Sequence, residues 1–358
     1  MHSRRWGEVL IHLVFLRAAP PAVIRLLMCL SALALVGAAL PSPTGPTLAA
    51  AGAQFTLDGQ ETFLLGVSLF DALGATPPRD EDLNALQRWG VKVVRVWAHW
   101  SVPIYDRDGS LTPDGRARLA ALVGRLRSRG ILLELVLLRP GQLPGQKDVA
   151  FSSADARVRA VTSITTTLLN DRDVLFDLFN EHDHAGGPIS HRDARRLRDA
   201  VKAVDPQRLV TISSTGTHLI TPAGTVRQRE EQNVREEVGR GPGDVGVDIL
   251  APHLPRSGDW AAATDSRVAI LRSALDRANS AVPIYLSEEN RHFPGRAIAP
   301  VTYVRAATGA RAARAAGWMF HTEAGFALGA RPFLAALTPS ERAALEQLSD
   351  KIRAFRPK

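Results

Sequence analysis

The chain has 358 residues and a single cysteine, Cys29. One thiol can neither close a disulfide within the chain nor provide the several cysteines of a zinc site. A disulfide-stabilised fold and a cysteine-rich metal centre are therefore excluded. Past the first 50 residues the sequence also lacks low-complexity tracts, linkers, and any repeat other than alternating strand and helix patterns, which favours one domain.

The net positive charge of the chain is small once residues 1–50 are set aside. The whole chain carries a net charge of +8, and residues 1–50 contribute +3 of it (four arginines against Glu8), which leaves +5. The arginines of the remainder are spread along helical patterns, such as residues 191–204, as is typical of solvated helix faces. We therefore expect no nucleic-acid partner.

Residues 1–53 differ in character from the rest. The run RLLMCLSALALVGAAL at residues 25–40 starts with an arginine, is apolar, and is followed by small residues and prolines. This pattern is typical of a secretory signal peptide, although a run of this length could also be retained as a membrane anchor. We expect a leader over residues 1–53, cleaved near residues 51–53 or kept as an anchor, and a secreted, periplasmic or extracellular protein.

From residue 54 onward, short apolar runs alternate with amphipathic helical patterns. An Asp58-Gly59 turn predicts a β-hairpin that leads into the first strand. The eight predicted strands lie at residues 64–70, 91–100, 131–138, 174–182, 209–216, 247–253, 282–290 and 317–321. Helical patterns separate them, and a last one covers residues 338–355. Buried strands alternating with helices predict an α/β fold: a (β/α)₈ (TIM) barrel over residues 54–358, with an open doubly wound sheet as the alternative.

Such a barrel carries its functional groups at the carboxyl ends of its strands. Two glutamates, Glu181 and Glu288, end apolar runs on predicted strands four and seven. A carboxylate at the end of a buried strand costs free energy unless it is hydrogen-bonded or serves a function. Other polar or aromatic residues at these ends are Asp71, Trp97, His99, Trp100, Asn180, His182, His184, His253, Glu289, Asn290, Arg291, His321 and Glu323.

Asn180-Glu181 and Glu288, at these two strand ends, resemble the arrangement in glycoside hydrolase clan A, most of all in the family 5 cellulase and mannanase group. The entry segment FTLDGQETFLLGVSLF, Arg95 in VVRVWAHW and His253 in DILAPH are also similar to that group. The resemblance extends over about residues 54–335. It implies hydrolysis of a β-linked glucan, mannan or related glycoside with retention, with Glu181 as acid/base and Glu288 as nucleophile about 5 Å away.

The same resemblance implies roles for further residues and no cofactor. Asn180 would hydrogen-bond the sugar 2-hydroxyl, and Arg95 would keep the nucleophile ionised, unless it only forms a structural ion pair. The partner would be an oligo- or polysaccharide, and we expect a monomer. The substrate contacts expected on this basis are Asn180, Arg95, His253, Trp97, His99, Trp100, Trp260 and His321.

The sequence departs from the family pattern in three places. The third predicted strand ends in LLRPG, without the histidine that many members have there. Leu254-Pro255 follows His253, so the usual tyrosine that would hydrogen-bond the nucleophile is missing. The tryptophan expected at the end of strand eight is replaced by His321, and aromatic residues make up only 6% of the chain.

Three alternatives stay open. Glu289 could face the barrel mouth in place of Glu288, because adjacent strand residues point to opposite sides; the proline spacing in PIYLSE favours Glu288. The protein could bind carbohydrate with little or no turnover, since the departures affect sugar contacts. It could also be a metal-dependent hydrolase, because several histidines follow strand ends: His182, His184, His253, His292 and His321.

Overall fold

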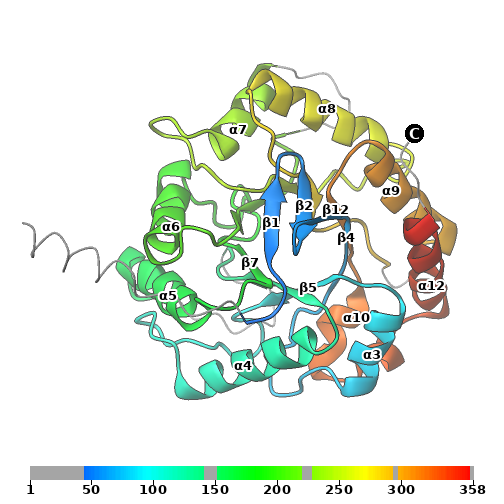
Figure 1. Ribbon diagram of the computed structural model, residues 1–358, viewed down its shortest axis with the longest axis horizontal. Helices are drawn as coiled ribbons and strands as arrows, with labels where there is room; N and C mark the ends of the chain where they lie inside the picture. Colours follow the sequence, from blue (N-terminus) through cyan, green and yellow to red (C-terminus); the bar gives the residue numbers. More distant parts are fainter. Residues whose placement is uncertain (1–43, 141–150, 220–227, 293–296, 355–358) are drawn as a thin grey trace, which may run out of the picture. The chain divides into compact units, whose positions relative to one another are not determined.

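The computed structural model describes residues 44–140, 151–219, 228–292 and 297–354. These residues form a ring of parallel strands surrounded by helices (Figure 1). The apolar run at residues 25–40 lies outside the described part, so the leader and the fate of the chain in the cell stay predictions. Among the described residues, no helix is both long and apolar enough to cross a lipid bilayer.

The strands follow one another around the ring in chain order. One sheet has the order β11-β12-β4-β5-β6-β7-β8, and β9, which continues β8, pairs with β10. Hydrogen bonds from Leu250 N to Pro283 O (3.0 Å) and from Tyr285 N to Leu250 O (2.9 Å) join β10 to β11 and close the barrel. The strands are β4 (Leu64–Ser68), β5 (Val93–Trp97), β6 (Leu132–Val136), β7 (Val174–Asp177), β8 (Val210–Thr211), β9 (Ser213–Ser214), β10 (Ala251–Pro252), β11 (Tyr285–Leu286) and β12 (Gly317–Phe320). The predicted barrel is confirmed, and the open doubly wound sheet is wrong.

Helices cover the outside of this ring (Figure 1). Several begin at a residue whose side chain accepts a hydrogen bond from the first turn, as Thr112, Ser153 and Ser190 do, which satisfies backbone groups that the helix itself leaves unpaired. The helices are α3 (Asp80–Arg88), α4 (Pro113–Arg127), α5 (Ala154–Thr167), α6 (His191–Val204), α7 (Gln228–Val238), α8 (Thr264–Arg277), α9 (Pro300–Ala312), α10 (Glu323–Phe326), α11 (Phe333–Ala336) and α12 (Pro339–Ala354), with a short 3₁₀ turn at Ala327–Gly329.

Side chains along each strand point alternately to the outside and the inside of the barrel, so they belong to two separate hydrophobic layers. On β5, Val94 and Val96 join the large core between sheet and helices, whereas Val93 joins a smaller cluster inside the barrel. The inside-facing residues that follow Val93 toward the carboxyl end are Arg95 and then Trp97. The interior therefore changes from apolar to charged to aromatic toward the carboxyl ends of the strands.

A three-stranded antiparallel sheet covers the amino-terminal end of the barrel (Figure 1). It consists of β1 (Leu48–Ala51), β2 (Gln54–Leu57) and β3 (Gln60–Thr62). Asp58 and Gly59 both have positive φ angles (50° and 79°), as a two-residue type I′ hairpin requires, so the predicted turn is confirmed. Strand β1 lies before the predicted domain start at residue 54 and belongs to the same folded unit.

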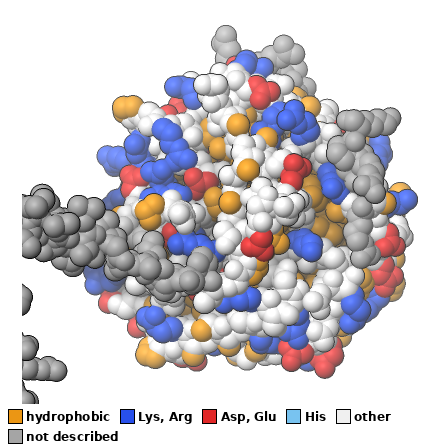
Figure 2. All heavy atoms as spheres, viewed as in Figure 1, with side chains coloured by type: hydrophobic (Ala, Val, Ile, Leu, Met, Phe, Trp, Pro, Cys, Tyr) orange, Lys and Arg blue, Asp and Glu red, His pale blue; other side chains and the backbone are white. Residues whose placement is uncertain are grey.

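The face that carries β1 and β2 is shown in Figure 2. Among the side chains described there, Lys and Arg are interspersed with Asp and Glu, and the hydrophobic side chains are scattered. This end of the barrel therefore presents no continuous patch of one charge sign among the described residues.

Phe55 on β2 closes the apolar end of the barrel. It is fully buried, and its ring meets that of Tyr285 edge-on at 6.1 Å between centroids. We expect Phe55→Ala to lower the free energy of unfolding by about 3–5 kcal/mol, because the lost ring leaves a cavity in a closed barrel. Urea unfolding measures this loss. The exposed Gln60→Ala on β3 serves as the control and should change stability by less than about 0.5 kcal/mol; similar effects for both variants would contradict this role of Phe55.

Candidate active site

Arg95 occupies the centre of the barrel and is fully buried. Its Nε donates to Glu134 Oε1 at 2.9 Å, and its Nη2 donates to Asp177 Oδ2 at 2.6 Å. These residues come from the neighbouring strands β5, β6 and β7, each at an inward-facing position. Burial disfavours the charged guanidinium, but the surrounding carboxylates outweigh this and raise the pKa of Arg95 above its ordinary value.

The same guanidinium reaches the predicted reaction centre. Arg95 Nη1 donates to Glu288 Oε1 at 2.5 Å, and Nη2 also donates to Asn180 Oδ1 at 2.8 Å. Glu134 completes this hydrogen-bond network without carrying a full negative charge, because burial raises its pKa to about 7. Tyr285 Oη donates a hydrogen bond to Glu134 Oε2 at 2.8 Å. Arg95 thus fixes both the amide and the carboxylate that the sequence singled out.

Glu181 follows β7 and has a left-handed backbone, with φ of 49°. This conformation is uncommon for a residue with a side chain and is found where surrounding contacts impose it. Here Ser213 Oγ accepts from Glu181 N at 3.1 Å, and His253 Nδ1 lies 3.1 Å from Glu181 Oε1. The turn directs the Glu181 carboxylate toward His253, which directly follows β10. His253 is held in turn by a hydrogen bond from its backbone N to Ser214 O at 2.8 Å.

The two glutamates are close neighbours. One ligand atom from each of Glu181, His253 and Glu288 lies within 4.8 Å of the others. Glu288 is nearly buried, with 8% of its side chain exposed, whereas Glu181 is exposed by 24%. The sequence placed these residues 107 positions apart, and the barrel brings them to one point.

Their surroundings separate the pKa values of the two acids. Burial opposes ionisation of both. For Glu288, the neighbouring His253 and the positive charges of Arg95 and Arg256 outweigh burial and hold the pKa well below its usual range. For Glu181, the hydrogen bond and charge of His253 outweigh burial, while the negative charge of Glu288 opposes them, so its pKa lies less far below the usual value. Glu288 is therefore the more strongly ionised of the pair.

A cavity of about 190 Å³ opens above this pair. Trp97 and Phe70 stack with their ring centroids 3.9 Å apart, Phe326 stacks on Phe70 at 3.5 Å, and Trp100 is only partly buried beside them. The cavity is lined by Phe70, Trp97, Trp100, Arg139, Pro140, Asn180, Glu181, His184, Arg256, Glu288, Arg291 and Phe326. The sequence-predicted contacts Trp97, Trp100 and Asn180 thus line the same cavity as the two glutamates.

His321 occupies the place of the expected tryptophan and lies behind the cavity. Its Nε2 is 2.8 Å from Arg291 Nη1 and 3.6 Å from Glu288 Oε2. Since arginine can only donate, Nε2 accepts, and Nδ1 carries the proton toward Ser68 Oγ at 3.1 Å. Burial lowers the pKa of His321 well below its usual value, which keeps the imidazole neutral.

Five predicted contacts are not among the residues that line the cavity. Three of them, Arg95, His253 and His321, contact Glu288 instead. Trp260 lies away from the cavity, because its ring is buried in the core between sheet and helices and meets Tyr303 edge-on at 6.2 Å. His99 does not line the cavity either. His99 is buried against Tyr105, and burial, together with the charge of Arg139, lowers its pKa to about 3. Both residues follow strand ends in the sequence, but their loops turn the side chains into the core.

The register at Glu288 and Glu289 is also decided by the structure. Glu288 lines the cavity, whereas Glu289 is buried behind the wall, and burial raises its pKa to about 8. Glu289 is therefore the protonated neighbour of an ionised glutamate, and of the two only Glu288 lines the cavity.

Three arginines of the cavity were not among the predicted contacts. Arg256 Nη2 donates to Glu288 Oε2 at 3.1 Å, in the loop where the family tyrosine is missing. Arg139 follows β6, with its guanidinium 5.6 Å from the Trp100 ring centre, and Arg291 lies 4.7 Å from that of Phe326. Arg139 and Arg291 follow strand ends directly, which was a usable signal. Arg256 lies three residues past His253 in the sequence. That position gave no signal, because only the path of the loop brings the side chain back to Glu288.

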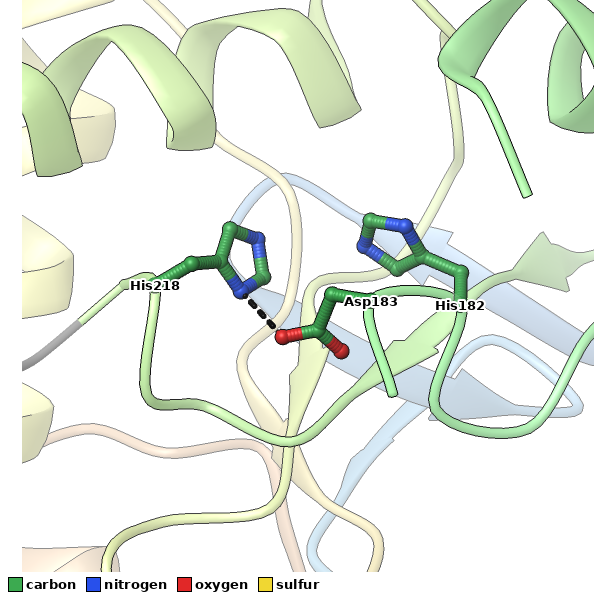
Figure 3. Close-up of side chains that lie close together, drawn as sticks. All are labelled: His182, Asp183 and His218. Atoms are coloured by element: carbon green, nitrogen blue, oxygen red, sulfur yellow. Dashed lines mark ion pairs between the residues drawn. The ribbon is translucent and has the colours of Figure 1, made fainter. Parts of the chain in front are cut away.

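Two groups of side chains in the described part have donor atoms close enough to hold a metal ion. One is Glu181, His253 and Glu288; the other is His182, Asp183 and His218. In the first, Glu288 already contacts the guanidiniums of Arg95 and Arg256, which would repel a divalent cation. In the second, shown in Figure 3, His218 Nδ1 lies 2.8 Å from Asp183 Oδ2.

His218 lies between two carboxylates. Besides Asp183, it contacts Glu237, whose Oε1 is 2.8 Å from His218 Nε2 and 3.2 Å from His182 Nε2. Burial opposes a charged imidazole, but these two acids outweigh it and raise the pKa of His218 to about 10. Asp183 in turn accepts from Thr215 N and Oγ1 at 2.7 and 2.6 Å. An imidazolium thus ties the loop that carries Glu181 to the loop after β9 and to α7.

This ion pairing predicts a pH-dependent stability. Because the folded pKa of His218 lies above the ordinary value of 6.5, its contribution is complete below about pH 6.5 and is lost as pH rises through about 10. We expect the unfolding free energy to fall between pH 7 and pH 10, and His218→Gln to weaken this fall. Urea unfolding of both proteins across this range tests it; equal slopes would show that His218 is not the titrating group.

Comparisons with known proteins place the fold. No known protein family and no curated protein sequence matches this chain. Among solved structures, an exo-β-1,4-mannosidase from Opitutaceae bacterium strain TAV5 is similar (TM-score 0.62, 18% identity, 83% of this chain and 60% of that one). An endo-1,4-β-mannanase from Rhizomucor miehei is also similar, with a TM-score of 0.60 and 13% identity over 86% of this chain and 100% of that one. A β-glucanase from Saccharophagus degradans in complex with cellotetraose has a TM-score of 0.60 and 15% identity over 88% of this chain and 98% of that one.

These similarities establish that the chain has the barrel fold of the mannanases and glucanases, as the resemblance of its strand-end residues implied. The chain spans less than two thirds of the length of the mannosidase. At these identities the likeness concerns the fold, so the activity must be argued from the site.

Proposed function

We propose that this protein is a retaining glycoside hydrolase that cleaves a β-linked glycoside through Glu181 and Glu288. The observation that carries the proposal is the closeness of the two carboxylates, since one oxygen of each lies within 4.8 Å of the other. Retaining enzymes hold their carboxyl groups about 5–5.5 Å apart, whereas inverting enzymes leave about 6.5–9.5 Å for a water molecule. The solved structures of this fold named above are a mannosidase, a mannanase and a glucanase, which supports a saccharide substrate.

In the first step, Glu288 attacks the anomeric carbon, and a covalent glycosyl ester forms as the glycosidic bond breaks. Glu181 gives its proton to the leaving oxygen, so the alcohol departs neutral. The pKa order supports this assignment, because Glu288 is the more strongly ionised acid. A bound sugar would displace water from Glu181, which favours its protonated form.

In the second step, Glu181, now ionised, takes a proton from water, and the hydroxide equivalent attacks the anomeric carbon. The ester bond to Glu288 breaks, and the sugar leaves with its original configuration. Arg95 is the counter-ion of Glu288 before the attack and after the ester has broken, with Nη1 at 2.5 Å from Oε1 of the free carboxylate, and it aims the amide of Asn180 by holding Oδ1 at 2.8 Å. The Asn180 Nδ2 group then faces the substrate as a donor for the sugar 2-hydroxyl.

The alternatives make different predictions. A binding protein without turnover would keep the same cavity but show no hydrolysis of any β-glycoside. A metal-dependent hydrolase would lose activity to a chelator. The contacts of Glu288 with two guanidiniums favour the glycosidase over the metal enzyme, since a cation at Glu288 would have to displace or oppose them. Export of the protein through the leader at residues 25–40 is part of the proposal, and it suits an enzyme that acts on extracellular glycans.

The central test is substitution of each glutamate. We expect Glu181→Gln to lower kcat/KM by about 10²–10⁴-fold on an alkyl glycoside, and less on an aryl glycoside whose leaving group needs no proton. Glu288→Gln should lower turnover on both. The matched control is Glu289→Gln, which replaces a buried, protonated acid by its neutral isostere. Turnover that survives in Glu288→Gln would exclude the proposed nucleophile.

A second test concerns the pH profile. His253 lowers the pKa of Glu181 through a hydrogen bond and its charge, so removing the imidazole should raise that pKa. Since the acid must be protonated, kcat/KM falls as pH rises through the pKa of Glu181 in the free enzyme. We therefore expect an acidic optimum, and we expect His253→Ala to move the alkaline limb to higher pH. A limb that stays in place or moves to lower pH would argue against Glu181 as the acid.

A further inference from the structure

Most of the polar side chains that line the cavity are hydrogen-bond donors. Apart from Asn180 and the two glutamates, its polar side chains are Arg139, Arg256, Arg291 and His184. Arginine can only donate hydrogen bonds, and His184 Nδ1 accepts from Gly186 N at 3.0 Å, so the proton of a neutral His184 lies on Nε2. Outside the reaction centre, these side chains therefore offer donors.

A neutral sugar and an anionic sugar differ in what they need. Each sugar hydroxyl both donates and accepts, so it is best matched by mixed partners and by aromatic faces. A carboxylate or sulfate only accepts, and the planar guanidinium matches it with two parallel hydrogen bonds. The cavity supplies aromatic faces for a sugar ring, and its three arginines add partners of the second type.

The charge balance of the lining points the same way. Among the lining residues, three guanidiniums face two carboxylates, which gives a net charge of +1 when both glutamates are ionised and +2 when Glu181 is protonated for the first step. Glu323, which pairs with Arg291 outside this lining, lowers each value by one. Arg256 contacts Glu288, and Arg291 contacts Glu323 and His321, so these cations are held in fixed positions. Side-chain exposures of 30% for Arg256 and 20% for Arg291 leave parts of both accessible.

The arginines also lie at the three places where the sequence departs from the family pattern. Arg139 follows the strand end that lacks a histidine, Arg256 lies in the loop that lacks a tyrosine, and Arg291 contacts His321, which replaces the tryptophan. From this arrangement we propose that the substrate is a glycan whose sugar at the cleavage site carries an anionic group, either a uronic acid carboxylate or a sulfate ester. This inference rests on the proposed glycosidase function and names its substrate class.

Matched substrate pairs test it. Aryl β-D-glucoside and β-D-glucuronide differ only in a hydroxymethyl group against a carboxylate, and the corresponding mannoside and mannuronide cover the other configuration. A 6-sulfated aryl glucoside separates sulfate from carboxylate. We expect kcat/KM to favour a charged member by at least about tenfold, and this preference to shrink in high salt because charge attraction is screened. A neutral member cleaved equally well or better would overturn the inference.

Arginine variants assign the preference to the cavity. Arg139→Met should remove most of the preference for the charged member, measured as the ratio of the kcat/KM values of the charged and the neutral glycoside with the same variant, and Arg139→Lys should keep part of it. Arg305→Met, on the exposed outer helix α9, removes the same charge far from the cavity lining and serves as the control. An unchanged preference in Arg139→Met, or an equal loss in Arg305→Met, would contradict recognition by the cavity.

A binding measurement separates this inference from the proposed reaction. Trp97 and Trp100 line the cavity, so their fluorescence should report glucuronic acid or glucose 6-sulfate binding at least about tenfold more tightly than glucose. Turnover of no glycoside together with tight binding of an anionic sugar would reject the glycosidase and retain the anionic ligand. Turnover without any preference for charge would retain the glycosidase and reject the anionic substrate.

Discussion

The buried guanidinium of Arg95 is the group on which the rest of the site depends. It is shared by Glu134, Asp177 and Glu288, and it also holds Asn180. In a barrel interior a carboxylate such as that of Glu288 could not stay ionised without a cation, because charges are poorly solvated there. One side chain therefore solves two problems: it makes a charged layer tolerable inside the barrel, and it fixes an ionised glutamate at the mouth.

The structure divides the barrel along its axis into regions with different tasks. The antiparallel sheet and Phe55 close the apolar end, where burial provides stability. The charged layer follows, and above it lies a cavity with aromatic and arginine side chains. Glu181 lies outside both the strands and the charged layer. Its left-handed backbone places it on a turn, and His218 stabilises this turn through an ion pair with Asp183. Arg95 and Arg256 hold Glu288, which lies just beyond β11, while a loop fixed by the His218–Asp183 ion pair carries Glu181.

Much of the fold could be predicted because its signals are local. Apolar runs and helical periodicity located all eight strand positions, and Asp58-Gly59 located the hairpin turn. Charged residues inside apolar strands, such as Glu134 and Asp177, carried a further signal that was overlooked: each faces the barrel interior beside Arg95. The predicted contacts that lie away from the cavity, Trp260 among them, belong to loops, where the position of a residue after a strand does not determine the direction of its side chain.

The sequence by itself determined the barrel and the chemical groups at its mouth, because strand period and chain order dictate which residues end inward-facing strands. Tertiary structure decided how those groups act. It brought Glu181 within reach of Glu288, turned Glu289 away, and brought Arg256 into contact with Glu288. These outcomes depend on loop paths and on distances between residues far apart in the chain. Electrostatic energies change steeply with such distances, so the pKa order of the two acids exists only in the folded protein.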